Sequence, residues 1–217
     1  MCFSAEASFI GGTIISTIGI VTLRKAHKPS QLLFASIPLL FGIQQIIEGI
    51  LWLIIPHTGV ALVRGIFTYL FLVFATVIWP FIIPLSVLLM EEKKKRKRLL
   101  VIPLVIGTLL SLFYVFCLIL VKVSPYAMRF HIQYNIDVPK QWDLIVLALY
   151  LIAIVTPLLI SSIKRANILG VLLFLSCIIT TVLFSQYFIS VWCFFAALIS
   201  GVIFWILSDS KKALAGN

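Results

Sequence analysis

Charged residues are scarce in this sequence. Only 11% of the 217 residues are charged, whereas soluble globular proteins carry about 25%. Hydrophobic residues make up 62%, and the mean hydropathy is +1.19. This composition excludes an ordinary soluble domain and predicts an integral membrane protein. The net charge of +10 comes from short basic runs between apolar segments, which argues against binding to nucleic acid.

Cysteine and histidine are too few and too scattered for the common metal or haem sites. The four cysteines have no paired spacing, which argues against a disulfide framework or a zinc knuckle. No histidine falls inside a long apolar stretch, which excludes a bis-histidine haem within a helical bundle. The last apolar stretch lacks a lysine for a retinal Schiff base, and neither a nucleophile elbow nor a phosphate-binding glycine loop is present. The sequence therefore predicts no metal and no cofactor.

Seven long apolar stretches account for most of the chain. A helix of about 20 apolar residues crosses the hydrocarbon core of a membrane, and only helices or closed barrels satisfy the backbone there. We therefore predict an all-α fold, a single transmembrane domain of seven helices over residues 1–217. The expected spans cover residues 4–23, 31–55, 62–90, 99–123, 142–162, 168–184 and 187–207.

Basic residues are distributed unevenly between the two ends of these spans. Thirteen of the 17 Lys and Arg residues fall in alternate connections and the C-terminal segment, and four fall in the remaining connections. The positive-inside rule then places the N-terminus outside and the C-terminus in the cytoplasm. An odd number of spans agrees with this arrangement, because it places the two ends on opposite sides of the membrane. The run EEKKKRKR at 91–98 is either a topology anchor or a binding site for anionic lipid.

Local breaks divide the longest apolar runs. Pro80 and Pro84 interrupt the third stretch. Because each proline removes a backbone donor and crowds the preceding turn, we predict a bend there. The run from 168 to 207 would be twice the membrane thickness as one helix, so it is predicted to form two spans joined near Ser185 and Gln186.

Polar side chains interrupt the second stretch, LLFGIQQIIEGILWLI, near its outer end. Gln44, Glu48 and Trp52 are four residues apart and share one helix face, with Gln45 beside them. Such a face is predicted to turn away from lipid, so Glu48 must find a partner or bind a proton. The group is a candidate ligand or proton site. The alternative is a set of interhelical hydrogen bonds that fix the packing.

The first stretch carries one acid and a row of small residues. Glu6 lies at its outer end, near the depth of Glu48, where it could pair with Glu48, be solvated or cap its helix. Small residues at every fourth position predict that another helix approaches closely. These residues are Ser4, Ser8, Gly12 and Ser16.

The longest outer connection alternates polar and apolar residues from 129 to 138. The polar side includes Arg129 and His131, and a period of two predicts an extended strand. One possibility is a lid whose polar face covers the outer mouth and brings Arg129 or His131 opposite Glu48. The other is a strand at the membrane interface with its apolar face toward lipid.

Several segments near the N-terminus carry a resemblance to other proteins. The opening MCFSAEASF, followed by TLRKAHKP and PLLFGIQQIIEGILW, resembles a family of uncharacterised bacterial multi-span membrane proteins that begin with Met-Cys-Phe-Ser. The pair Trp79 and Pro80 also resembles that family. The match covers the first third of the chain and implies a multi-pass protein of a bacterial inner membrane, but no reaction. It draws attention to Cys2, Glu6, Gln44, Gln45, Glu48 and Trp52.

Three functions are compatible with these features. The leading hypothesis is an outward-facing polar pocket around Glu48 that binds and transports a small solute or ion, with Glu48 as ligand or proton-exchange group. The alternative is an intramembrane enzyme acting on a lipid or an extracytoplasmic small molecule, with Glu48 as general acid or base. The third is a receptor-like or structural bundle. The expected partners are membrane lipid and a small solute, ion or lipid, and the oligomeric state stays open. The candidate ligand-binding residues are Glu48, Gln44, Gln45, Trp52, Glu6, His131 and Arg129.

Overall fold

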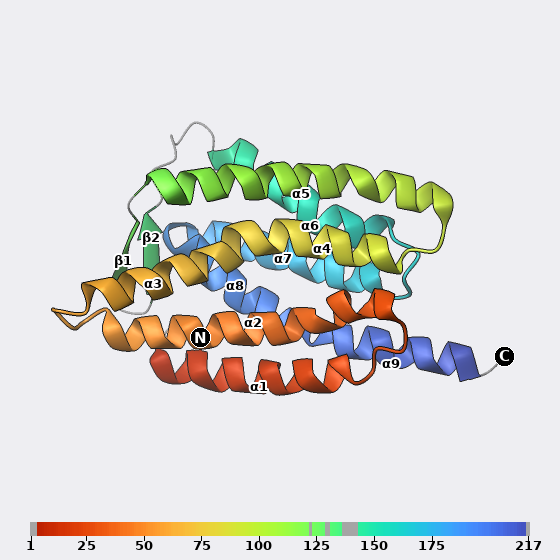
Figure 1. Cartoon of the computed structure of the whole chain (residues 1–217), viewed down its shortest axis with the longest axis horizontal. Helices are drawn as coiled ribbons and strands as arrows, with labels where there is room; N and C mark the ends of the chain where they lie inside the picture. Colours follow the sequence, from red (N-terminus) through yellow and green to blue (C-terminus); the bar gives the residue numbers. More distant parts are fainter. Residues whose placement is uncertain (1–3, 122, 129–130, 136–142, 216–217) are drawn as a thin grey trace.

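Long apolar helices lie side by side along the length of the molecule (Figure 1). The computed structural model describes residues 4–121, 123–128, 131–135 and 143–215. Within these residues, six helices are long and apolar enough to cross a membrane, and the apolar helix Leu144–Ile160 falls short of that length. This architecture is that of a multi-pass membrane protein.

The helices fall where the apolar stretches predict them, and the all-α class is confirmed. The fifth predicted span is the helix that falls short, and the seventh contains two helices that meet at Gly201. In chain order the elements are α1 (Ala5–Leu23), α2 (Pro29–Ile54), α3 (Ala61–Leu72), η1 (Val73–Ile78), α4 (Trp79–Met90), α5 (Lys94–Leu120), β1 (Ser124–Met128), β2 (His131–Asn135), α6 (Asp143–Ile160), α7 (Ala166–Leu183), η3 (Ser185–Tyr187), α8 (Phe188–Ser200) and α9 (Val202–Ala215).

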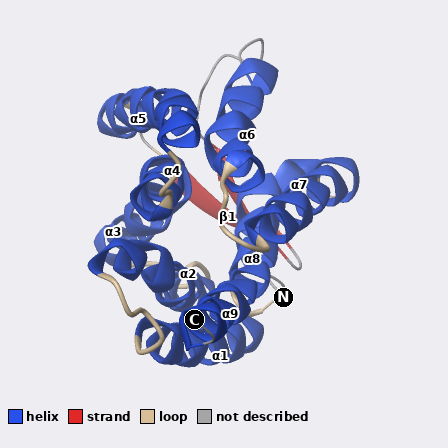
Figure 2. Ribbon diagram, turned by 90° about the vertical axis from the view of Figure 1, so that its right-hand side faces the viewer, coloured by secondary structure: helices blue, strands red, loops and turns tan. Residues whose placement is uncertain are grey.

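Helix α2 is enclosed by five other helices of the bundle. It packs against α1, α3, α4, α8 and α9, and the view along the bundle shows these helices around it (Figure 2). Its polar residues Gln44, Gln45 and Glu48 are fully buried. The prediction that this face turns away from lipid is therefore confirmed.

Small residues bring α1 and α2 into backbone contact. A Cβ atom at Gly42 would lie 2.6 Å from the backbone N of Ser16, and one at Gly19 would lie 2.3 Å from a backbone N of α2. The predicted close approach of another helix to this row is confirmed. Ser4 has a different role, because its hydroxyl caps α1 by accepting a hydrogen bond from the N–H of Ala7.

A π-helical stretch, η1, joins α3 and α4 into one continuous helix. Pro80 has no N–H for the preceding turn, so one carbonyl upstream of it lacks its usual helical donor. The hydroxyl of Tyr150 on α6 donates to the Ala75 carbonyl, and that of Ser111 on α5 donates to the Val77 carbonyl at 2.7 Å. The ribbon changes direction between α3 and α4 (Figure 1). The bend predicted from the prolines is thus formed at a π-helical stretch that side chains of α5 and α6 stabilise.

A two-stranded antiparallel hairpin, β1 and β2, lies across one end of the bundle, which we call the hairpin end. The extended conformation predicted for this connection is confirmed for β2. Its orientation differs from both expectations, because Ile132 and Tyr134 are buried in the protein. The ring of Tyr134 stacks on Phe71 of α3 at a centroid distance of 4.8 Å. The hairpin therefore covers the bundle with its apolar face, because apolar side chains can be buried there without losing hydrogen bonds.

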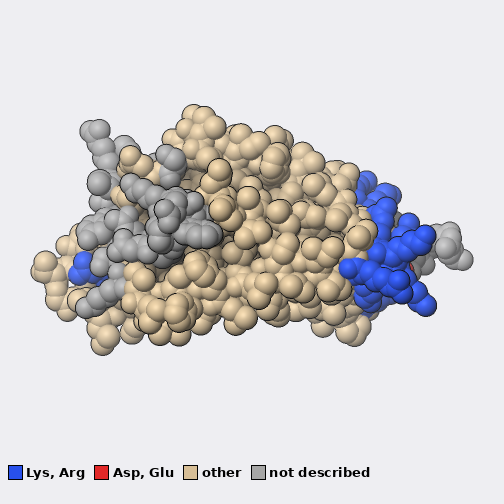
Figure 3. Space-filling view, turned by 90° about the horizontal axis from the view of Figure 1, so that it is seen from above, with Lys and Arg blue, Asp and Glu red and all other residues tan. Residues whose placement is uncertain are grey.

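Lysine and arginine side chains gather at the opposite end, which we call the basic end (Figure 3). The connection before α2, the start of α5 and the connection before α7 all meet there. Arg64 lies at the hairpin end, in the first turn of α3. This separation is what the positive-inside rule requires, and the orientation itself stays a prediction.

Glu91 joins two connections at the basic end. Its buried carboxylate accepts hydrogen bonds from the backbone N–H and hydroxyl of Ser162, and from the N–H of Lys93 at 2.9 Å. Arg96 donates to the Ile160 carbonyl at 2.9 Å. Burial raises the pKa of Glu91, but the hydrogen bonds and nearby Arg96 outweigh it, so the pKa lies below its usual value. The carboxylate therefore holds the end of α4 against the end of α6.

We predict that Gly107→Ala destabilises the bundle. The added methyl group would lie 1.8 Å from the carbonyl oxygen of Pro80, so α4 and α5 would have to separate, at a cost of about 1–3 kcal/mol. The midpoint of thermal unfolding in detergent should fall. Gly65→Ala is the matched control, because nothing lies within 4 Å of its Cβ position. Equal midpoints for the two variants would contradict the prediction.

We also predict that Glu91→Gln lowers the free energy of unfolding at neutral pH by about 1.5–3 kcal/mol, because hydrogen bonds to a charged group are lost. The folded pKa of Glu91 is lowered, so this stabilisation is complete above the usual carboxyl range and disappears as the pH falls through the folded value. Unfolding midpoints measured across the acid range should fall more steeply for wild type than for Glu91→Gln. The control Glu92→Gln removes an exposed ion pair with Lys28 and should change little.

Candidate functional site

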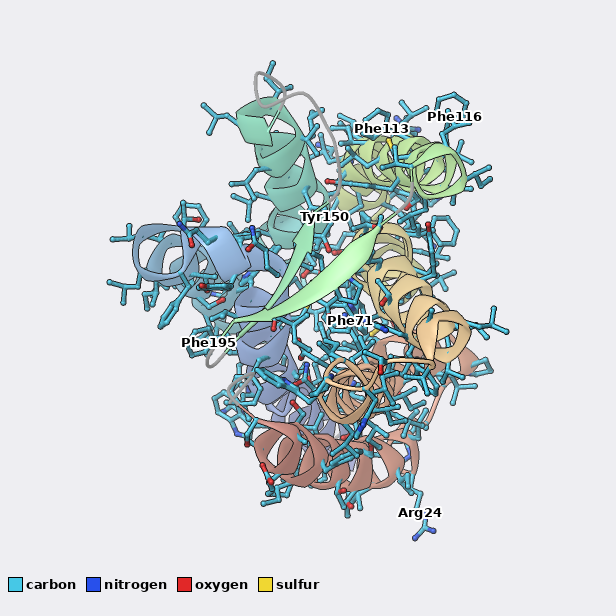
Figure 4. The ribbon with its side chains drawn as sticks, turned by 90° about the vertical axis from the view of Figure 1, so that its left-hand side faces the viewer. Arg24, Phe71, Phe113, Phe116, Tyr150 and Phe195 are labelled. Atoms are coloured by element: carbon cyan, nitrogen blue, oxygen red, sulfur yellow. The ribbon has the colours of Figure 1, made fainter. Side chains whose placement is uncertain are left out.

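A cavity of about 370 Å³ lies beneath the hairpin, between η1, α5, α6, α7, η3, α8 and β2. Its volume falls in the range of small-molecule pockets, roughly 300–1,000 Å³. Figure 4 looks onto this end and shows the hairpin lying across it, with Tyr150 beside the strands. Six aromatic rings from five different elements line the cavity. They belong to Tyr114, Tyr134, Tyr150, Tyr187, Phe188 and Trp192.

Several polar hydrogens of the lining are donated to the protein itself. The hydroxyl of Tyr150 donates to the Ala75 carbonyl, and Trp192 Nε1 donates to Ser176 Oγ at 3.1 Å. The Thr76 hydroxyl donates to its own helix at 2.8 Å. What the lining offers a ligand is therefore mainly aromatic surface. Gln186, on η3, is an exposed side chain among the lining residues.

Gln44 ties three helices together behind the cavity wall. Its Oε1 accepts a hydrogen bond from Trp79 Nε1 at 2.8 Å, and its Nε2 donates to Cys193 Sγ at 3.4 Å. Trp79 stacks on Phe41 at a centroid distance of 3.7 Å. Because Cys193 also lines the cavity, this network connects the amide of α2 to the cavity through one side chain of α8.

Glu48 of α2 lies against the first turn of α8. It is fully buried, and its Oε1 accepts a hydrogen bond from the hydroxyl of Ser190. Ser190 is in the first turn of α8, where the helix dipole favours a negative charge. This position can therefore hold the charged form of Glu48 when the side chain releases a proton, without a basic partner.

Two further polar groups of α2 are enclosed without a hydrogen bond from the described part of the protein. Both atoms of the Gln45 amide and Nε1 of Trp52 are in this position, as is the hydroxyl of Ser8 on α1. Gln45 and Ser8 are fully buried, and Trp52 is half-buried. Such groups are costly in an apolar interior unless another molecule bonds to them.

The structure separates the predicted site residues into groups. Gln44, Gln45, Glu48 and Trp52 lie together on α2, whereas Glu6 is exposed near the start of α1 and is not brought into this buried group. His131 lies on β2, but its side chain is outside the described part, as are Arg129 and Cys2 as whole residues. Among the predicted residues whose side chains are described, none lines the cavity.

The aromatic lining escaped sequence analysis, although a weak signal was present. Tyr114, Tyr150 and Trp192 each stand inside an apolar run, at depths where the interfacial aromatic belt does not explain them. Each needs a partner for its polar atom or an interior space for its ring. Among the described residues, no group of three His, Cys, Asp or Glu side chains could hold a metal ion.

A family profile matches residues 1–216 of the chain, and its description is a family of unknown function, DUF6629. The chain belongs to the DUF6629 family. The match extends well beyond the first third that carries the sequence resemblance, and it attaches no activity to this DUF6629 member. No curated protein and no solved structure matches the chain.

We predict that Ser190→Ala destabilises this DUF6629 member by about 1.5–3 kcal/mol, because a buried carboxyl group loses its hydroxyl donor. Ser86→Ala is the matched control, since Ser86 is equally buried but donates only to the Ile83 carbonyl of its own helix. Thermal unfolding in detergent, combined with Glu48→Gln in a double-mutant cycle, measures the coupling of the pair. A cycle with no coupling, or equal losses for the two serine variants, would contradict the prediction.

Proposed function

We propose that this protein spans the cytoplasmic membrane of a bacterium, with the hairpin end outside, and binds a small amphipathic molecule in the cavity beneath the hairpin. The observation that carries the proposal is the cavity itself, about 370 Å³ in volume with six aromatic rings in its lining. Aromatic faces favour hydrocarbon, ring or cationic groups over strongly hydrated solutes. The ligand should therefore have an apolar or aromatic body and few hydrogen-bonding groups.

The surroundings of the cavity support entry from the lipid. Val146 and Leu147 of α6 and Thr181 of α7 are lining residues. At the basic end the two helices are in close contact, where a Cβ atom on Gly170 would lie 3.1 Å from Leu158. Neighbouring residues at the hairpin end are exposed and apolar, such as Val182 at 73%. A gap between α6 and α7 at this end would admit a molecule dissolved in the outer leaflet.

One observation favours transport as a second function. The cavity wall includes Ala75 and Thr76, which belong to the π-helical stretch η1, and such stretches are frequent at functional sites. The stacked pair Phe41 and Trp79 fills the adjacent core. Movement of a ligand beyond the cavity would require Trp79 to leave Gln44, which gives the hydrogen bond between these two side chains a gating role. Uptake into proteoliposomes that depends on pH and disappears in Glu48→Gln would support this function.

We predict that Thr181→Trp abolishes ligand binding by filling the cavity. Native mass spectrometry of the full chain, incubated with bacterial lipid extract and released gently from detergent, should detect a defined bound mass in wild type. Val182→Trp is the matched control, because Val182 is the next residue and is 73% exposed. The bound mass should persist in Val182→Trp and be lost in Thr181→Trp.

Two results would contradict the binding proposal. A bound mass that persists in Thr181→Trp would place the ligand outside this cavity. If wild type carries no bound mass after incubation with the extract, the cavity does not bind an amphipathic molecule of this class. Equal unfolding midpoints of the two tryptophan variants would establish that a difference in binding is not a difference in folding.

A further inference from the structure

A polar stripe runs along α2 from the interior toward the hairpin end. Gln45, Glu48 and Trp52 are spaced by three and four residues, so they follow one another along one side of the helix over about 10 Å. Gln45 is fully buried and Trp52 is half-buried. The stripe therefore connects an enclosed position with the boundary of the bundle near the end of α2.

The junction of α1, α2 and α8 encloses this stripe. Gly49 of α2 faces the ring of Phe9, with its Cβ position 3.0 Å from the ring, so Ser8 lies beside the same turns of α2 as Glu48 and Trp52. Helix α8 contacts α1 at the same level, because the Cβ position of Gly11 lies 3.5 Å from the ring of Phe194 on α8. Ser8 contributes a third buried polar group to the junction.

The unbonded atoms at this junction include both donors and acceptors. Gln45 Nε2 and Trp52 Nε1 can only donate, Gln45 Oε1 can only accept, and Ser8 Oγ can do either. A bare cation would leave the N–H groups without an acceptor, and an anion would leave the amide oxygen without a donor. Water bonds to all of them and is small enough to lie between packed helices.

We propose that the junction of α1, α2 and α8 holds a chain of water molecules that lets Glu48 exchange a proton with the solution at the hairpin end. Gln45 and Ser8 bond the inner water molecules, and Trp52 bonds water at the boundary. Glu48 is held between them by Ser190. This inference goes beyond ligand binding, and it does not depend on what occupies the cavity.

The titratable neighbours of Glu48 are few among the described residues. Helix α8 brings Cys193, which bonds to Gln44. Helix α1 brings Glu6, which is exposed, and α3 brings Arg64 and Tyr69, which donate to the carbonyls of His57 and Val121. The described parts of α4 and α9 bring no ionisable side chain to this depth. Proton exchange at this junction is thus assigned to Glu48 itself.

Infrared spectroscopy of the full chain in lipid nanodiscs tests this assignment. The band of the protonated Glu48 carboxyl is identified as the one missing from Glu48→Gln, and its shift is followed after transfer to D₂O. We expect the wild-type band to shift promptly and Gln45→Leu to slow the shift by about tenfold or more, because the inner water molecules lose their partner. Gln45→Asn, which keeps an amide, should restore fast exchange. Gln186→Leu, at the cavity, should behave as wild type.

Three results would overturn the inference. They are a wild-type band that does not shift, equal rates for wild type and Gln45→Leu, and no carboxyl band between about pH 5 and pH 9. If Gln45→Leu does not fold, Ser8→Ala and Trp52→Phe replace it, and unchanged rates in both would overturn the inference. Because no added ligand is involved, failure here is distinct from failure of the cavity to bind an amphipathic molecule.

Discussion

In the interior of a membrane, backbone carbonyls must find their donors within the protein, and this constraint shapes the cavity wall. Pro80 removes one N–H donor from the π-helical stretch before it, and the hydroxyls of Tyr150 and Ser111 donate to carbonyls of that stretch. The same bonds hold α5 and α6 against the continuous helix of α3 and α4. Because Tyr150 also lines the cavity, one side chain takes part both in the bonding of this stretch and in the wall of the pocket.

The class of the fold and the positions of its helices follow from hydropathy, because long apolar segments have few alternatives in a membrane. The orientation of the hairpin does not follow, because a period of two identifies two faces without saying which one is covered. The role of Glu91 is equally hidden. It stands in the run EEKKKRKR, where every neighbour indicates solvated charge, and its partner Ser162 comes from a connection 71 residues away.

The candidate site likewise has a part that could be predicted from the sequence and a part that could not. The polar residues of α2 are conspicuous in an apolar run, so burial of Gln44, Gln45 and Glu48 could be predicted from the cost of exposing them to lipid. The cavity could not, because it is assembled from segments spread between η1 and α8. A single polar residue in an apolar segment is enough to predict burial, whereas a cavity depends on how several segments pack together.

The contact between Gly107 and the carbonyl of Pro80 limits how the bundle can deform. Where two helices meet backbone to backbone, no layer of side chains separates them, so sliding or rotation of α4 against α5 is hindered at this point. The hydrogen bonds of Glu91 and Arg96 tie the basic end of α6 to the same pair of helices. A movement that widens the cavity would therefore have to leave these contacts in place and involve the hairpin end.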